Sequence, residues 1–205
     1  MNSNTNTKNI KIEKEDDVLE MNVSFQNIAA LPNPLPSALE VLYCYSNQLA
    51  ALPSGLKELY CSGNQLAALP PLPSGLEVLY CCDNQLAALP PLPHGLKKLG
   101  CSYNQLTVLP PLPFGLEELS CQDNKLTELP PLPSKLRDLY CDDNQFKYKG
   151  ITIEEIRKEQ EEEEEEKRKN IWMANLIVFR KVKQEMGFCE DTKFDWLVKN
   201  IISHF

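Results

Sequence analysis

The sequence predicts an α/β fold: a solenoid of short stacked coils, with a parallel β-sheet on its concave face and extended segments on its convex face, followed by an α-helical hairpin. Three observations predict it. The pattern L-x-x-L-x-C-x-x-N-x-L recurs around six asparagines, which are Asn47, Asn64, Asn84, Asn104, Asn124 and Asn144. The step between them is 17 residues once and 20 thereafter, which marks an internal repeat whose coils have no room for a helix. Two amphipathic stretches with capping signals follow the last repeat.

The first 17 residues are polar and contain no apolar run, so residues 1–17 are expected to form a flexible segment. The same composition indicates neither a signal peptide nor a lipidation signal. A degenerate unit then opens the solenoid, with Gln26 where the asparagine should stand. Its apolar positions are Val18, Met21, Val23, Ile28 and Leu31. The solenoid is therefore expected over residues 18–149.

The apolar residues of each coil need to be buried, and this requirement explains why the coils stack. Leu76, Leu79 and Cys81 would point inward from a short strand, and one coil alone cannot bury them. Stacking the coils joins the strands into a parallel sheet and makes the core continuous. Asn84 stands where the chain leaves the strand, so its amide can bond backbone groups of its own turn and the neighbouring turn. The L-P-P-L-P segment at residues 69–73 favours an extended return path, and its leucines close the convex side.

Six of the eight cysteines occupy the same position of the repeat, namely Cys44, Cys61, Cys81, Cys101, Cys121 and Cys141. They suggest either a metal or disulfide ladder or a column of small buried side chains. The sequence has no C-x-x-C spacing and no histidine in phase with the repeat, so we expect buried, reduced thiols and no metal or cofactor. This implies a reducing, intracellular compartment. Cys82 falls on the outward side of its strand and is expected to be exposed, as a reactive thiol or a neutral surface substitution.

The outward positions of the strands form the predicted concave face. Its first half is aromatic and nearly neutral, and its far half becomes acidic through Asp123, Asp138, Asp142 and Asp143. Tyrosine is enriched at protein interfaces, which makes these positions candidate partner-binding residues. The candidates are Tyr43, Tyr45, Tyr60, Tyr80, Tyr103, Tyr140 and Asp142. Two alternatives remain: stacked tyrosines can serve solenoid stability alone, and the acidic end can receive a basic segment or be ordinary solvated surface.

Residues 150–205 form the predicted helical segment. Thr152 with Glu155 is a capping box, and Glu161–Glu166 precede Lys167–Lys169 at spacings that allow i,i+4 ion pairs. An apolar face follows, and Gly187 separates it from a second amphipathic helix that opens at Thr192. The first face carries Trp172, Leu176, Phe179, Val182 and Met186, and the second carries Phe194, Leu197, Val198, Ile201, Ile202 and Phe205. A hairpin cannot bury all of this surface on itself, so it must dock on the last coil as a cap, on a second copy, or on another protein. Candidate binding residues are Trp172, Leu176, Phe179, Phe194, Leu197 and Ile201.

Charge and motifs narrow the function classes. The net charge is −8, and the repeats carry no basic stripe, which argues against nucleic acid as the partner. The longest strongly apolar stretch, Trp172–Phe179, is too short to span a membrane. The sequence contains no phosphate-binding glycine loop, zinc spacing or serine–histidine pair, so we assign no catalytic residue and expect no enzyme.

The repeats resemble the leucine-rich-repeat family over roughly residues 18–148. The L-P-x-L-P segment before each strand is similar to the short repeats of secreted bacterial effectors of the YopM and IpaH type. The wording L-Y-C-x-x-N-Q-L is also similar to repeat proteins of large DNA viruses of amoebae. This resemblance implies a protein-binding module in the host cytoplasm, or alternatively a structural component of an assembly such as a scaffold, capsid or virion.

The IpaH resemblance adds one remote alternative, a ubiquitin ligase. Cys189-Glu190-Asp191 matches the C-x-D motif of that family's nucleophile. The family's ligase domain is several times longer than residues 150–205, and the two carboxylates would raise the pKa of the thiol. The interaction module is therefore the preferred hypothesis.

Overall fold

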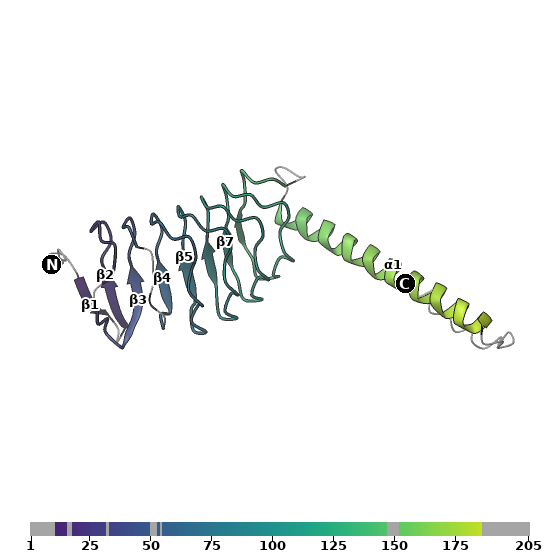
Figure 1. Cartoon of the computed structure of the whole chain (residues 1–205), viewed down its shortest axis with the longest axis horizontal. Coiled ribbons are helices and arrows are strands. Elements are labelled where there is room, and N and C mark those ends of the chain that lie inside the picture. Colours follow the sequence, from purple (N-terminus) through teal and green to yellow (C-terminus); the bar gives the residue numbers. More distant parts are fainter. Residues whose placement is uncertain are drawn as a thin grey trace. The chain divides into compact units, whose positions relative to one another are not determined.

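The structure, a computed structural model, describes residues 11–15, 18–31, 33–49, 53, 55–146 and 152–185. Eight strands form one sheet in the order of the sequence (Figure 1). They are β1 (Lys11–Glu15), β2 (Val18–Asn22), β3 (Leu39–Tyr43), β4 (Glu58–Tyr60), β5 (Val78–Tyr80), β6 (Lys98–Gly100), β7 (Glu118–Ser120) and β8 (Asp138–Tyr140). Strands β2 to β8 are parallel, and helix α1 (Ile153–Glu185) follows them. The predicted α/β solenoid is confirmed.

Strand β1 was not predicted, because the sequence analysis expected a flexible segment over residues 1–17. It runs antiparallel to β2, with Lys11 opposite Asn22 and Glu15 opposite Val18. An antiparallel neighbour pairs the backbone edge that the first coil would otherwise leave open. β1 therefore covers the N-terminal end of the parallel sheet.

The core is a set of columns that run through the coils. The central leucines of neighbouring strands lie in register, as in Leu79 opposite Leu99, and Leu42, Leu79, Leu99 and Leu119 are fully buried. The repeat cysteines Cys44, Cys61, Cys81, Cys101 and Cys121 have no exposed surface, and Cys141 in the last coil is half-buried. The predicted column of buried thiols is confirmed, and all seven described cysteines are free.

The repeat asparagines form a ladder of hydrogen bonds between coils. Asn104 Nδ2 donates to the carbonyls of Cys81 at 3.0 Å, Cys101 at 3.1 Å and Ser102 at 3.2 Å, and its Oδ1 accepts the Leu86 N–H at 3.0 Å. The carbonyl of Cys81 also accepts from Asn84 at 3.1 Å, so each asparagine shares an acceptor with its neighbour. Because the turn is buried, these bonds satisfy backbone groups that water cannot reach. The predicted bridging role of the asparagines is confirmed.

The start of α1 closes the last coil. The predicted capping box forms: Thr152 N donates to Glu155 Oε2 at 2.8 Å, and Glu155 N donates to Thr152 Oγ1 at 3.2 Å. This fixes the first turn so that Ile156 joins the solenoid core with 2% of its surface exposed. Arg157 Nη2 donates to the Pro133 carbonyl at 2.6 Å and to the Leu136 carbonyl at 3.1 Å. The first turn of α1 therefore covers part of the last coil, whereas docking of the predicted hairpin on this coil stays a prediction.

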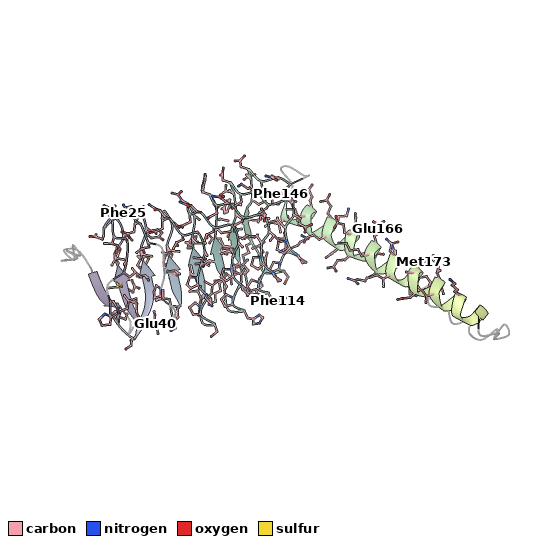
Figure 2. All side chains as sticks on the ribbon, in the orientation of Figure 1. Phe25, Glu40, Phe114, Phe146, Glu166 and Met173 are labelled. Carbon is pink, nitrogen blue, oxygen red and sulfur yellow. The ribbon has the colours of Figure 1, made fainter. Side chains whose placement is uncertain are left out.

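Further along, α1 carries the predicted ion pairs. Glu163 pairs with Lys167, Glu164 with Arg168 and Glu165 with Lys169, at 3.7, 3.0 and 2.6 Å. Side chains point outward along the whole acidic part of the helix, as for the labelled Glu166 (Figure 2). The second predicted helix, and with it the hairpin, lies outside the described residues. Within the described part of the chain, no helix is both long and apolar enough to cross a membrane.

Candidate binding surface

The outward face of strands β3 to β8 presents four columns of side chains, called here the sheet surface. Each central leucine points inward, so its two neighbours in the strand point outward. The first column is Val41, Glu58, Val78, Lys98, Glu118 and Asp138, and the second is Tyr43, Tyr60, Tyr80, Gly100, Ser120 and Tyr140. The positions after the cysteines add Tyr45, Ser62, Cys82, Ser102, Gln122 and Asp142, and then Ser46, Gly63, Asp83, Tyr103, Asp123 and Asp143. Apart from Asp138, no residue of the first column was predicted to lie on this face, although strand alternation places all of them there.

Three tyrosines of the second column stack as a continuous group, the tyrosine ladder Tyr43, Tyr60 and Tyr80. The ring centroids of Tyr43 and Tyr60 are 4.7 Å apart with planes at 14°, and those of Tyr60 and Tyr80 are 5.6 Å apart at 8°. Tyr45 adds a tilted ring at 6.4 Å from Tyr43 and 5.9 Å from Tyr60. Four of the predicted tyrosines are thus brought together, and part of each ring's surface is used to stabilise the stack.

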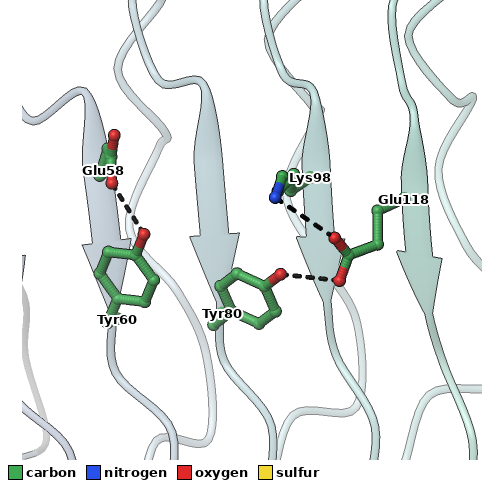
Figure 3. Close-up of polar contacts among 5 residues, drawn as sticks. All are labelled: Glu58, Tyr60, Tyr80, Lys98 and Glu118. Carbon is green, nitrogen blue, oxygen red and sulfur yellow. Dashed lines mark hydrogen bonds and ion pairs between the residues drawn. The ribbon is translucent and has the colours of Figure 1, made fainter.

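Carboxylates of the first column bind two of the ladder's three hydroxyl groups (Figure 3). Tyr60 donates to Glu58 Oε2 at 2.7 Å, and Tyr80 donates to Glu118 Oε1 at 2.7 Å. Lys98 Nζ lies 3.6 Å from the other Glu118 oxygen. Burial, followed by these hydrogen bonds, raises the pKa of both tyrosines, so both phenols are protonated donors at neutral pH. Glu58 thus adds one carboxylate to the first half of the surface, which was predicted to be aromatic and nearly neutral.

Tyr80 reaches Glu118 two coils away because the residue between them is Gly100. A Cβ at Gly100 would lie 2.4 Å from Tyr80 Cδ1 and 2.9 Å from its Cε1. The ring therefore lies across the glycine, where any side chain would displace it. Gly100 directly follows Tyr80 in the second column, so the tyrosine ladder ends there.

We expect Gly100→Ala to destabilise the protein by about 1 kcal/mol, because the ring must swing away and give up its bond to Glu118. Urea unfolding followed by circular dichroism measures this change. Gly115→Ala is the matched control, since a Cβ there meets no atom within 4 Å, and it should leave stability unchanged or raise it slightly. Equal destabilisation by both substitutions would contradict the close approach of the ring.

The other predicted residues of this face stand apart from the ladder. Tyr103 and Tyr140 are exposed, with 56% and 50% of their surface accessible, and Asp142 is also exposed. The Asp123 carboxylate beside Tyr103 raises the pKa of that tyrosine. The expectation that Cys82 is exposed was wrong: it is half-buried, with its sulfur next to Gly100, and burial raises its pKa. A thiol with a raised pKa is not an activated nucleophile.

The sheet surface carries seven carboxylates, those of Glu58, Asp83, Glu118, Asp123, Asp138, Asp142 and Asp143. Lys98 is the one basic residue in its four columns, and it is already paired with Glu118. Carboxylates on one face with little compensation create a negative potential that attracts cationic groups. Across the described residues, no group of three or more histidines, cysteines or carboxylates is arranged to hold a metal ion.

The predicted residues of the helical segment are placed in part. Trp172 and Leu176 are half-buried on α1, whereas Ile171, Met173, Ile177 and Val178 are exposed, with 63, 48, 61 and 61% of their surface accessible. The side chain of Phe179 lies outside the described residues, as do Phe194, Leu197 and Ile201. Cys189, the residue of the remote ligase hypothesis, lies outside them as well.

Parallel strands joined by extended returns, with an asparagine ladder and inward leucines, define the chain as a leucine-rich-repeat solenoid. The chain is similar to YopM from Yersinia enterocolitica, with a TM-score of 0.61, 37% identity, and coverage of 63% of this chain and 29% of that protein. It is also similar to a Shigella effector leucine-rich-repeat domain, with a TM-score of 0.59, 38% identity, and coverage of 64% and 61%. For YopM from Yersinia pestis the TM-score is 0.52 and the identity 27%, and the match covers 62% of this chain and 50% of that protein. The predicted resemblance to bacterial effector repeats is confirmed, and that to amoebal virus proteins stays a prediction.

The chain spans between 29% and 61% of the length of these proteins, so the similarity concerns their repeat region. No protein-family model matches the sequence, and no curated protein matches it. The shared architecture is that of a leucine-rich-repeat solenoid.

Proposed function

We propose that the protein binds a positively charged segment of a partner protein through its sheet surface, in a reducing intracellular compartment. The single observation that carries this proposal is the charge of the surface, where seven carboxylates face one paired lysine. A basic segment would gain from this potential in both association rate and specificity.

The tyrosine ladder would supply the apolar part of the contact. Its rings are half-buried and held in place by stacking, and those of Tyr60 and Tyr80 also by their bonds to Glu58 and Glu118. Rings that are already ordered lose little conformational entropy on binding, so they suit a hot spot beside a charged region. Lysine and arginine side chains also pack their aliphatic stems on aromatic surfaces.

The test uses the full chain as bait for a displayed library of random peptides, because such a library offers basic, acidic and apolar segments to the surface in one competition. We expect the selected peptides to be rich in lysine and arginine and to lose affinity as salt rises. Tyr45→Ala should weaken a selected peptide about tenfold or more. Asp123→Asn and Asp142→Asn should each weaken it a few-fold, and Glu128→Gln, on the return segment beyond the four columns, is the matched control.

Two outcomes would overturn the proposal: selected peptides without basic residues, or affinities unchanged by all sheet-surface substitutions. Tyr60→Phe separates the two roles of the ladder. It keeps the ring and removes the bond to Glu58, so a binding loss in that variant would indicate that hydroxyl positioning matters.

A second candidate function is attachment to a larger assembly through α1. The observation that favours it is the exposure of four apolar side chains on the helix, Ile171, Met173, Ile177 and Val178. Such a role predicts that the protein co-purifies in fixed proportion with a large particle, and that Ile177→Asp releases it.

A further inference from the structure

We infer that residues 170–183 of α1 form a docking helix for an acidic protein with an apolar groove that encloses a helix. This inference is independent of the sheet-surface proposal, and it specifies the partner for the second candidate function, attachment through α1. The inference begins from how apolar residues are distributed around this part of the helix.

The apolar residues of α1 cover its whole circumference over a short length. Ile171, Trp172 and Met173 are consecutive, and so are Leu176, Ile177 and Val178. Successive residues of an α-helix are turned by about 100°, so each run of three spans more than half of the surface. Trp172 and Leu176 are half-buried while the other four are exposed, which leaves apolar surface on several sides of the helix. A helix that is apolar all round requires burial all round.

This distribution distinguishes between the classes of occupant. A membrane surface covers one face of an interfacial helix, and a coiled-coil partner covers one stripe. Either arrangement would leave part of the apolar surface in water. A protein groove that wraps around the helix covers every side, and helix-in-groove recognition is a common mode of peptide binding.

The charges that flank the apolar run indicate the sign of the charge expected on the partner. Lys167, Arg168 and Lys169 precede it, and Arg180, Lys181 and Lys183 follow it. The first three pair with glutamates of the preceding turn, but these ion pairs are exposed and contribute little, so they can exchange partners. Basic residues at both ends of an apolar run fit a groove with an acidic rim.

The same charges argue against a second copy of this chain. A parallel pair of helices places Lys167 to Lys169 against their own counterparts. An antiparallel pair centred on the apolar run places Lys167 opposite Lys183 and Lys169 opposite Lys181. Both arrangements bring like charges together, which is unfavourable. The acidic run Glu161–Glu166 would be repelled by an acidic groove and therefore sets the N-terminal limit of the docked segment.

The test uses the full chain with Trp196→Phe, so that Trp172 is the one fluorescent tryptophan. The probe is calcium-loaded calmodulin, an acidic protein whose methionine-rich groove opens when calcium binds. We expect saturable binding with a blue shift of the Trp172 emission, abolished by a calcium chelator. Ile177→Asp and Lys181→Glu should each lower the affinity at least tenfold, and Glu162→Gln, outside the docked segment, should leave it unchanged.

Circular dichroism of each variant checks that the helix persists. Three results would overturn the inference: no binding to the loaded probe, affinity unaffected by both substitutions, or self-association of the chain in sedimentation at the same concentrations. Binding to phosphatidylserine vesicles without binding to calmodulin would also overturn it and would assign the segment to an anionic membrane surface.

Discussion

Asn104→Ala is expected to destabilise the protein by about 3 kcal/mol, because the Leu86 N–H loses its acceptor inside the buried turn and three further bonds disappear. The carbonyls of Cys81, Cys101 and Ser102 keep a second donor, so the orphaned N–H carries most of the cost. Urea unfolding of the purified chain measures the loss. Gln105→Ala is the matched control, since Gln105 is the exposed neighbour, and its effect should stay within about 0.5 kcal/mol.

Asn104→Asp tests the same bonds by introducing a charge while keeping the size of the side chain. The carboxylate keeps the acceptor for Leu86 but faces three carbonyl oxygens, so we expect a loss at pH 7 at least as large as that of the alanine variant. Burial against these oxygens should raise the pKa of the introduced acid, so the deficit relative to the native protein should shrink as the pH is lowered. A variant as stable as the native protein at pH 7 would contradict the ladder.

The second large effect is a steep loss of stability at alkaline pH. Burial raises the pKa of Cys44 to about 12, and the pKa values of Cys61, Cys81, Cys101 and Cys121 are also raised well above their usual range. Unfolded thiols ionise near pH 8.5 to 9. Above that pH the unfolded chain has released protons that the folded chain keeps, so the free energy of unfolding falls as pH rises. Below it, the five thiols contribute no pH dependence.

Each buried thiol contributes a slope of about 1.4 kcal/mol per pH unit once the unfolded form is fully ionised. With five such thiols, we expect the protein to unfold between roughly pH 9.5 and 11, given a total stability of about 5–15 kcal/mol. Urea midpoints measured across this range in a reducing buffer give the slope. Cys101→Ala should lower the slope by about one proton. A flat profile to pH 11 would show that the cysteine column is accessible to solvent.

Much of the fold could be predicted because the residues that determine each coil lie close together within one repeat. The inward leucines, the cysteine and the asparagine recur at fixed short spacings, and one coil repeated six times leaves few ways to bury them. The capping box at Thr152 and the glutamate–lysine pairs of α1 are likewise local, since their partners lie three or four residues apart. Strand β1 was not predicted because it precedes the repeats and its residues do not follow the repeat pattern.

The candidate surface was predictable as a set of columns but not as a set of contacts. The sequence placed Tyr60 and Tyr80 on the outward face, and strand alternation could also have placed Glu58 and Glu118 there. It could not show that Tyr80 reaches Glu118, because those residues are 38 positions apart and the contact depends on the absence of a side chain at Gly100. The half-burial of Cys82 has the same origin, since its neighbours belong to adjacent coils.

The sequence by itself therefore determined the coil, its inward residues, its stacking into a parallel sheet and the sign of the charge on the outward face. Periodic burial requirements within each repeat are sufficient for these features. Only the tertiary structure decided which tyrosine bonds which carboxylate, and that Ile156 and Arg157 cover the last coil. These contacts join side chains that stacking brings together from different coils, and their geometry depends on the size of each neighbour rather than on any local pattern.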